Sequence, residues 1–136
     1  MREHHVSSDD DFATILQAQA DWVHGAPPCK TFSAARRVDI HARVKRLRSE
    51  DRPQGFGWEV TELANKLAFR MLELAKGPLK KGKYFSIENP YTSLMWALKP
   101  YIKLATEEGV RIVRIHQCMG GSIHKKETGV LTNAPW

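Results

Sequence analysis

Two short stretches of the chain hold residue types that can carry out nucleophilic and acid–base chemistry. Cys29 follows two prolines in "APPCKTFS", and Glu88 lies near the end of "FSIENP". A cysteine attacks as its thiolate, from a free pKa of about 8.5, so the neighbouring Lys30 and the arginines after it favour reactivity. A carboxyl group such as Glu88 can donate or accept a proton. The pattern predicts a thiol–carboxyl site, and the alternative is an inert cysteine buried in a rigid turn.

The elements predicted around these stretches would bring them together. A short apolar run at 21–26, before Cys29, predicts a buried strand, and "KYFSIENP" predicts a second strand that ends at Pro90. Between them we predict a helix from about Glu59 to Lys76, ended by Gly77-Pro78. Because reactive groups gather at the carboxyl ends of strands in open α/β sheets, we expect both stretches at one rim. The predicted apolar stripe of the helix is Val60, Leu63, Leu67, Met71, Leu74 and Ala75.

The rest of the chain completes a predicted α/β domain that covers residues 1–136. Helical spacing at 12–20 predicts a first helix with N-caps among Asp9–Asp11, and two short helices are predicted at 94–105, the second with Pro100 in its first turn. A third strand at 109–119 and a fourth at 128–133 form an antiparallel pair. The sheet is therefore expected to be parallel until a final hairpin.

That strand inventory leaves one edge of the strand at 21–26 without a neighbour. An unpaired apolar edge is a liability for a folded protein. We therefore expect either that a partner chain covers this edge, or that the N-terminal half of a larger sheet is missing from this chain and the domain is a fragment or partial fold.

Positive charge is concentrated in one segment. The formal net charge is +6, and seven basic against three acidic residues lie between Ser33 and Arg52, within a predicted loop at 33–57. This density predicts contact with the phosphates of a nucleic acid, while a solvated basic face without a partner is the alternative. The candidate nucleic-acid-binding residues are Arg36, Arg37, Arg43, Lys45, Arg46 and Arg48.

Composition indicates which broad classes of protein the chain can belong to. The chain is 42% hydrophobic and 26% charged, which is typical of a globular domain. No apolar run approaches the roughly 20 residues of a membrane span, and the N-terminus has no signal-peptide pattern. Two cysteines make no disulfide framework, so we expect an intracellular, reducing compartment. We expect no metal site, although a zinc site is an alternative that would draw on His24, Cys29, His116, Cys118 and His124.

Three stretches resemble, in order, motifs of the DNA cytosine-5 methyltransferase family. "APPCKTFS" resembles the family's Pro-Pro-Cys motif, and "FSIENP" resembles its Glu-Asn-Val motif at the end of the next strand. "GGSIHKKETGVLTN" is similar to a later motif in which a Gln and two arginines precede a strand. The resemblance spans roughly Asp21 to Asn133. It implies a partial Rossmann-like methyltransferase sheet, with parallel strands and a C-terminal antiparallel hairpin.

The resemblance also implies a role for each matching residue. Cys29 would attack C6 of a flipped-out cytosine, which makes C5 nucleophilic toward the methyl group of S-adenosylmethionine. Glu88 would contact the base edge and help to protonate N3. The basic stretch would take the place of the loop that closes over DNA. The other residues at motif positions are Pro28, Asn89, Lys125 and Lys126.

The sequence departs from the family pattern in several places. Lys30 stands where the family has Gln, and Pro90 where it has Val. There is no Phe-x-Gly-x-Gly loop for the cofactor, and no target-recognition region follows "VLTNAPW". We therefore expect the catalytic half of such an enzyme. A second hypothesis is a catalytically inactive, basic subunit that binds nucleic acid or has a structural role in a larger complex.

Overall fold

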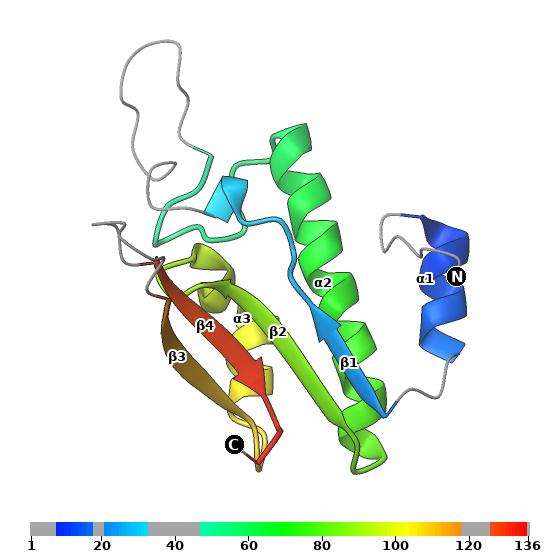
Figure 1. Cartoon of the computed structure of the whole chain (residues 1–136). Coiled ribbons are helices and arrows are strands. Elements are labelled where there is room, and N and C mark those ends of the chain that lie inside the picture. The colour runs from blue at the N-terminus through cyan, green and yellow to red at the C-terminus, as the bar shows by residue number, and fades with distance from the viewer. Residues whose placement is uncertain (1–7, 18–20, 33–46, 118–125, 136) are drawn as a thin grey trace.

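A four-stranded mixed sheet with helices forms the framework of the protein (Figure 1). The computed structural model describes residues 8–17, 21–32, 47–117 and 126–135. The strands are β1 (Trp22–Gly25), β2 (Tyr84–Pro90), β3 (Arg111–Gln117) and β4 (Lys126–Thr132), in the order β1-β2-β4-β3. The predicted α/β class is confirmed.

The final hairpin is folded back into the sheet. β4 pairs antiparallel with β3, as predicted, but its other edge pairs antiparallel with β2. The described sheet therefore has one parallel pair of neighbours, β1 with β2. β1, β2 and β3 nevertheless run in the same direction and β4 runs against them, as predicted for a sheet that is parallel until a final hairpin. The insertion of β4 between β2 and β3 was not predicted.

The predicted strand at 21–26 is correct in position and wrong in burial. Along β1 the residues alternate between exposed and half-buried, and Trp22 is 44% exposed. β1 is one of the two edge strands of the described sheet, and no other described strand pairs with its outer side. Its inner face meets a helix so closely that a Cβ on Gly25 would lie 1.9 Å from Cε of Met71.

The helix that crosses from β1 to β2 is longer than predicted. α2 spans Glu59–Lys80 and continues through Gly77 and Pro78, so the predicted stop is wrong. Pro78 has no amide hydrogen to donate to the carbonyl four residues before it, and its side chain is buried. Gly82, with φ of 70°, follows the helix instead.

The buried face of α2 also differs from the predicted stripe. Val60 and Leu63 are both 53% exposed, whereas the polar Thr61 and Asn65 are buried. The buried Arg48 donates to Oδ1 of Asn65 and to the backbone carbonyl of Thr61, whereas the Thr61 hydroxyl has no partner among the described residues. The residues of α2 that are buried are Thr61, Ala64, Asn65, Ala68, Met71, Leu72, Leu74, Ala75 and Pro78.

Four short helices complete the described structure, and one of them, η1 (Lys30–Phe32), follows Cys29. α1 (Asp9–Gln17) is capped by Ser8, whose Oγ accepts from the Asp11 amide at 3.3 Å, so the predicted Asp caps lie inside the first turn. η3 (Leu94–Ala97) and α3 (Lys99–Ala105) confirm the two predicted short helices, with Pro100 in the first turn of α3. No helix in the described ranges is long and apolar enough to span a bilayer.

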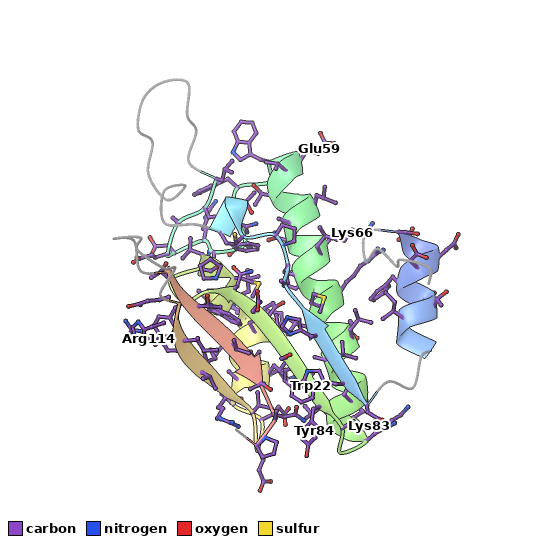
Figure 2. The ribbon with its side chains drawn as sticks, in the orientation of Figure 1. Trp22, Glu59, Lys66, Lys83, Tyr84 and Arg114 are labelled. Atoms are coloured by element: carbon purple, nitrogen blue, oxygen red, sulfur yellow. The ribbon has the colours of Figure 1, made fainter. Side chains whose placement is uncertain are left out.

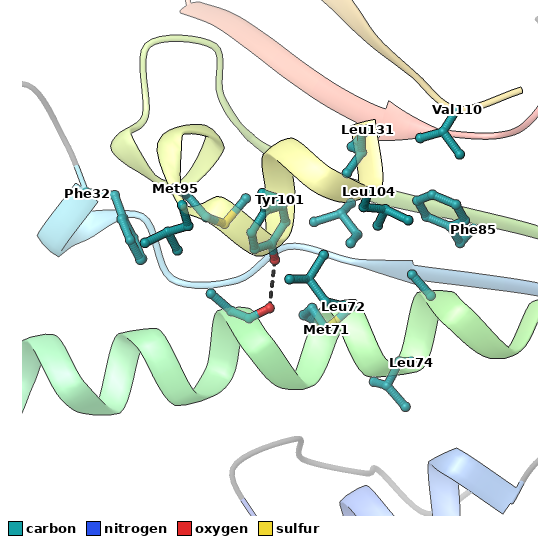
Figure 3. Close-up of a cluster of buried hydrophobic side chains, with 14 of the residues drawn as sticks. Phe32, Met71, Leu72, Leu74, Phe85, Met95, Tyr101, Leu104, Val110 and Leu131 are labelled. Carbon is teal, nitrogen blue, oxygen red and sulfur yellow. Dashed lines mark hydrogen bonds between the residues drawn. The ribbon is translucent and has the colours of Figure 1, made fainter. Parts of the chain in front are cut away.

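The core lies between the sheet and the helices α2 and α3 (Figure 3). Phe85 and Leu131 enter it from the sheet, and Met71 from α2. The hydroxyl of Tyr101, on α3, donates to the Ala68 carbonyl of α2 at 2.7 Å, drawn as a dashed line in Figure 3. This packing fixes β1 and β2, and thus the positions of their carboxyl ends.

Candidate functional site

A cleft of about 600 Å³ lies at the carboxyl ends of β1 and β2. It brings together both chemical stretches that the sequence indicated, together with the beginning of β4. Cys29 and Glu88 therefore line a single cavity, as the strand order predicted. The lining residues are Ala26, Pro27, Pro28, Cys29, Glu88, Asn89, Pro90, Thr92, Glu127 and Thr128.

The turn that carries Cys29 is fixed on both sides. The Cys29 carbonyl accepts from the Phe32 amide at 2.9 Å, which closes the short helix η1 (Lys30–Phe32). On the other side, Asn89 of β2 donates from Nδ2 to the Pro27 carbonyl at 2.9 Å. The thiol itself is free and exposed, so the structure does not support an inert cysteine buried in the turn.

Asn89 has an unusual feature for a buried side chain. It is 3% exposed, and its Oδ1 has no hydrogen-bond partner within the described residues. Nδ2 is used by Pro27, and Oδ1 is itself shielded from solvent. A buried polar atom without a partner is costly, so the contact to Pro27 is what Asn89 contributes to the cleft.

Glu88 is accompanied by a histidine from the neighbouring strand. Nε2 of His24 lies 3.6 Å from Oε2 of Glu88, and the two side chains are 52% and 43% exposed. Nδ1 of the same ring lies 2.6 Å from Oγ of Ser86. The sequence indicated His24 only as a ligand of the alternative zinc site. The parallel register of β1 and β2, which places it beside Ser86, supplies its actual neighbours.

A second carboxylate, Glu127 of β4, also lines the cleft. It is not among the site residues that the sequence indicated. Its Oε2 accepts from Arg114 of β3 at 2.6 Å, and His116 Nδ1 lies 3.6 Å from Oε1. This hydrogen bond raises the pKa of Arg114 above its ordinary value. Arg114 also lies over the ring of Tyr91, 4.7 Å from its centroid, on the side of the sheet away from β1 (Figure 2).

Arg48 is buried below the cysteine turn, which corrects its predicted role. It is 0% exposed and donates to Thr31, Asn65 and the Pro53 carbonyl, at distances from 2.7 to 3.3 Å. Its guanidinium also lies 3.5 Å from the centroid of the Phe32 ring. Burial lowers the pKa of Arg48 to about 10, so it stays charged at neutral pH. The prediction that Arg48 binds nucleic acid is wrong, because internal acceptors occupy its donors.

The remaining predicted site residues are placed as follows. Pro28 lines the cleft, and Lys126 begins β4. Among the described residues, no three His, Cys, Asp or Glu side chains gather in a way that could hold a metal ion. The predicted residues that lie outside the described ranges are Arg36, Arg37, Arg43, Lys45, Arg46, Cys118, His124 and Lys125.

The cleft thus combines one thiol and two carboxylates. A thiol can add to an electrophilic carbon, and a carboxyl group can protonate a neighbouring nitrogen. Comparisons with known proteins identify no family for the chain. Protein-family models, curated proteins and solved structures were all searched, and none matches the chain.

Proposed function

We propose that the chain carries the thiol site of a DNA cytosine-5 methyltransferase-like domain, and that its sheet is part of a Rossmann-like methyltransferase sheet. One observation carries the proposal. Cys29 follows β1, Glu88 and Asn89 end the parallel neighbour β2, and all three line the same cleft. The sequence motifs that resemble the family thus meet at one place.

In the proposed reaction the cysteine adds to the cytosine ring and thereby activates C5. The Cys29 thiolate forms a bond to C6, and the C5=C6 electron pair moves into the ring as a proton from Glu88 is added to N3. The adduct is an enamine whose C5 is nucleophilic. Expulsion of the thiolate reverses the addition.

The residues of the cleft suit a base better than they suit S-adenosylmethionine. A cofactor cradle of this kind uses glycines that let the backbone approach closely. None of the four described glycines with positive φ, at positions 55, 57, 82 and 109, lines the cleft. We therefore derive no step through the cofactor, and propose that a partner chain or residues beyond the described ones hold it.

The proposed partner follows from the basic residues of the sequence, and the proposed compartment follows from the exposed thiol. DNA would be bound by the basic residues of 36–46, without Arg48, whose donors are used inside the protein. A reducing, intracellular compartment would keep the exposed Cys29 as a free thiol.

A test that needs no methyl donor follows from the enamine. When C5 of the adduct takes up a solvent proton and the original hydrogen leaves, reversal returns cytosine with an exchanged H5. We expect the full chain to release tritium into water from DNA that contains [5-³H]cytosine. Cys29→Ser should release none. Cys118→Ser, at the other of the two cysteines, serves as the matched control and should keep the wild-type rate.

Two results would contradict the proposal. One is equal release by wild type and Cys29→Ser, and the other is no release by wild type while DNA is bound. DNA binding that falls with salt, without exchange, would instead support the second candidate, a catalytically inactive nucleic-acid-binding subunit.

A further inference from the structure

A row of side chains leads along β1 and β2 to Glu88. Trp22 pairs with Tyr84 and His24 with Ser86 in the parallel register, so these side chains lie on one face of the sheet. Figure 2 labels Trp22 and Tyr84 where the row begins. The indole Nε1 of Trp22 lies 3.0 Å from Ser86 Oγ, and this oxygen lies 2.6 Å from Nδ1 of His24. The row ends where Nε2 of His24 faces Oε2 of Glu88 at 3.6 Å.

Hydrogen-bond chemistry gives this row a direction. An indole N–H can only donate, so Ser86 Oγ accepts from Trp22. Ser86 is 3% exposed, and Nδ1 of His24 is the acceptor that the described structure offers to its hydroxyl hydrogen. A neutral imidazole that accepts at Nδ1 carries its hydrogen on Nε2. The N–H that results faces the Glu88 carboxyl group.

We propose that Trp22 and Ser86 fix the tautomer of His24, and that its Nε2–H holds Oε2 of Glu88 in the cleft. His24 is then a positioning residue for the carboxyl group. The 3.6 Å separation is longer than a direct hydrogen bond, so the proposed contact requires the two half-exposed side chains to approach each other or a water to bridge them. Hydrogen bonds of catalytic groups commonly tighten when the substrate binds.

The catalytic consequence rests on the proposed function. When Oε2 of Glu88 accepts from His24, a protonated Glu88 carries its hydrogen on Oε1, and this is the oxygen that serves N3 of cytosine. His24 loses no proton in the step. The other titratable side chains that line the cleft are Cys29 and Glu127, and Glu127 is already bonded to Arg114.

Nitrogen and carbon NMR of the labelled full chain tests the row without any reaction. At a pH where His24 is neutral, we expect its hydrogen on Nε2. Ser86→Ala should move the Nδ1 resonance toward that of a free acceptor nitrogen. His24→Leu should shift the side-chain carboxyl carbon of Glu88, while His116→Leu, which removes the histidine beside Glu127, should leave it in place. A hydrogen on Nδ1 in the wild type, or an unchanged Glu88 carbon in His24→Leu, would overturn the proposal.

The exchange assay then measures the catalytic consequence. We expect His24→Leu to lower tritium release about tenfold, the effect of one lost hydrogen bond of roughly 1.4 kcal/mol. His24→Gln, whose amide N–H can reach the same carboxyl oxygen, should stay within about threefold of wild type. If the wild type releases no tritium, the proposed function is contradicted, while the NMR experiment still tests whether His24 carries its hydrogen on Nε2. If tritium is released and Nδ1 carries the hydrogen, the row is wrong and the proposed function stands.

Discussion

Arg48 donates two hydrogen bonds from Nε and Nη2 to the carbonyl and hydroxyl oxygens of Thr31, at 3.0 and 2.8 Å. Thr31 lies two positions after Cys29, so the guanidinium holds the turn that presents the thiol. The same group donates to the Pro53 carbonyl and to Oδ1 of Asn65 on α2, each at 2.7 Å. One buried cation thus fastens the cysteine turn to the helix that crosses between β1 and β2.

Removing this cation should destabilise the protein strongly. In Arg48→Met the acceptors at Thr31, Pro53 and Asn65 stay buried without donors, and breaking such a network costs about 3–5 kcal/mol. We expect urea unfolding at pH 7 to show this loss in the free energy of unfolding. The matched control is Arg52→Met, in the same segment, where the exposed guanidinium lies 5.6 Å from the centroid of the Phe56 ring. A loss in Arg48→Met no larger than in this control would contradict the assignment.

The contact between Asn89 and Pro27 should govern the reactivity of the thiol. Asn89→Ala removes the donor to the Pro27 carbonyl, so we expect a loss of about 1–3 kcal/mol in stability and a changed alkylation rate at Cys29. Asn133→Ala is the matched control, because Asn133 bonds to Lys83 and Phe85 at the opposite end of β2. It should reduce stability while leaving the alkylation rate at Cys29 unchanged. Equal alkylation rates in both variants would show that the contact of Asn89 with Pro27 does not govern the reactivity of Cys29.

Local signals in the sequence were sufficient where neighbours along the chain decide the structure. β2 ends at Pro90 as predicted, and Pro100 sits in the first turn of α3 because a proline is favourable where no amide donor is needed. The shared cleft was also predictable, since parallel strands that follow one another place their carboxyl ends at one edge. These inferences used short-range rules and the order of elements only.

Long-range packing decided the features that the sequence analysis missed. Arg48 resembles its basic neighbours in sequence, and only the meeting of its segment with Thr31 and Asn65 buries it. The predicted hydrophobic stripe of α2 is correct at Met71, Leu74 and Ala75 and wrong near the start of the helix, where Leu63 is exposed and Thr61 is buried. The insertion of β4, which brings Glu127 to the cleft, likewise depends on pairing with β2.

Two glycines should respond to alanine with opposite signs. A Cβ on Gly25 would lie 1.9 Å from Cε of Met71, so Gly25→Ala must displace a buried side chain, at a cost of about 1–3 kcal/mol. Gly77 lies inside α2 with open space around its Cα, so Gly77→Ala should raise stability by roughly 0.5–1 kcal/mol through helix propensity. Thermal and urea unfolding of both variants measure the difference. The result would contradict the close approach of β1 to α2 if Gly25→Ala were as stable as wild type.

Tyr101 should make the protein sensitive to alkaline pH. Burial raises the pKa of its hydroxyl well above the ordinary value of 10.0, and this hydroxyl donates to the Ala68 carbonyl. Because the unfolded chain releases this proton first, the stabilisation is complete below pH 10 and declines as the pH rises further, by about 1.4 kcal/mol per pH unit.

Urea unfolding at pH 8, 10 and 11 measures this contribution. We expect Tyr101→Phe to lose about 1 kcal/mol at pH 8 with the hydrogen bond, and to lose less than wild type between pH 10 and 11. The control Tyr84→Phe removes the hydroxyl from a ring that is 38% exposed, and it should keep the wild-type decline. Parallel stability curves for wild type and Tyr101→Phe across this interval would show that another group causes the alkaline loss. A smaller decline in Tyr101→Phe would place the titrating group where α3 meets α2, beneath the strands that form the cleft.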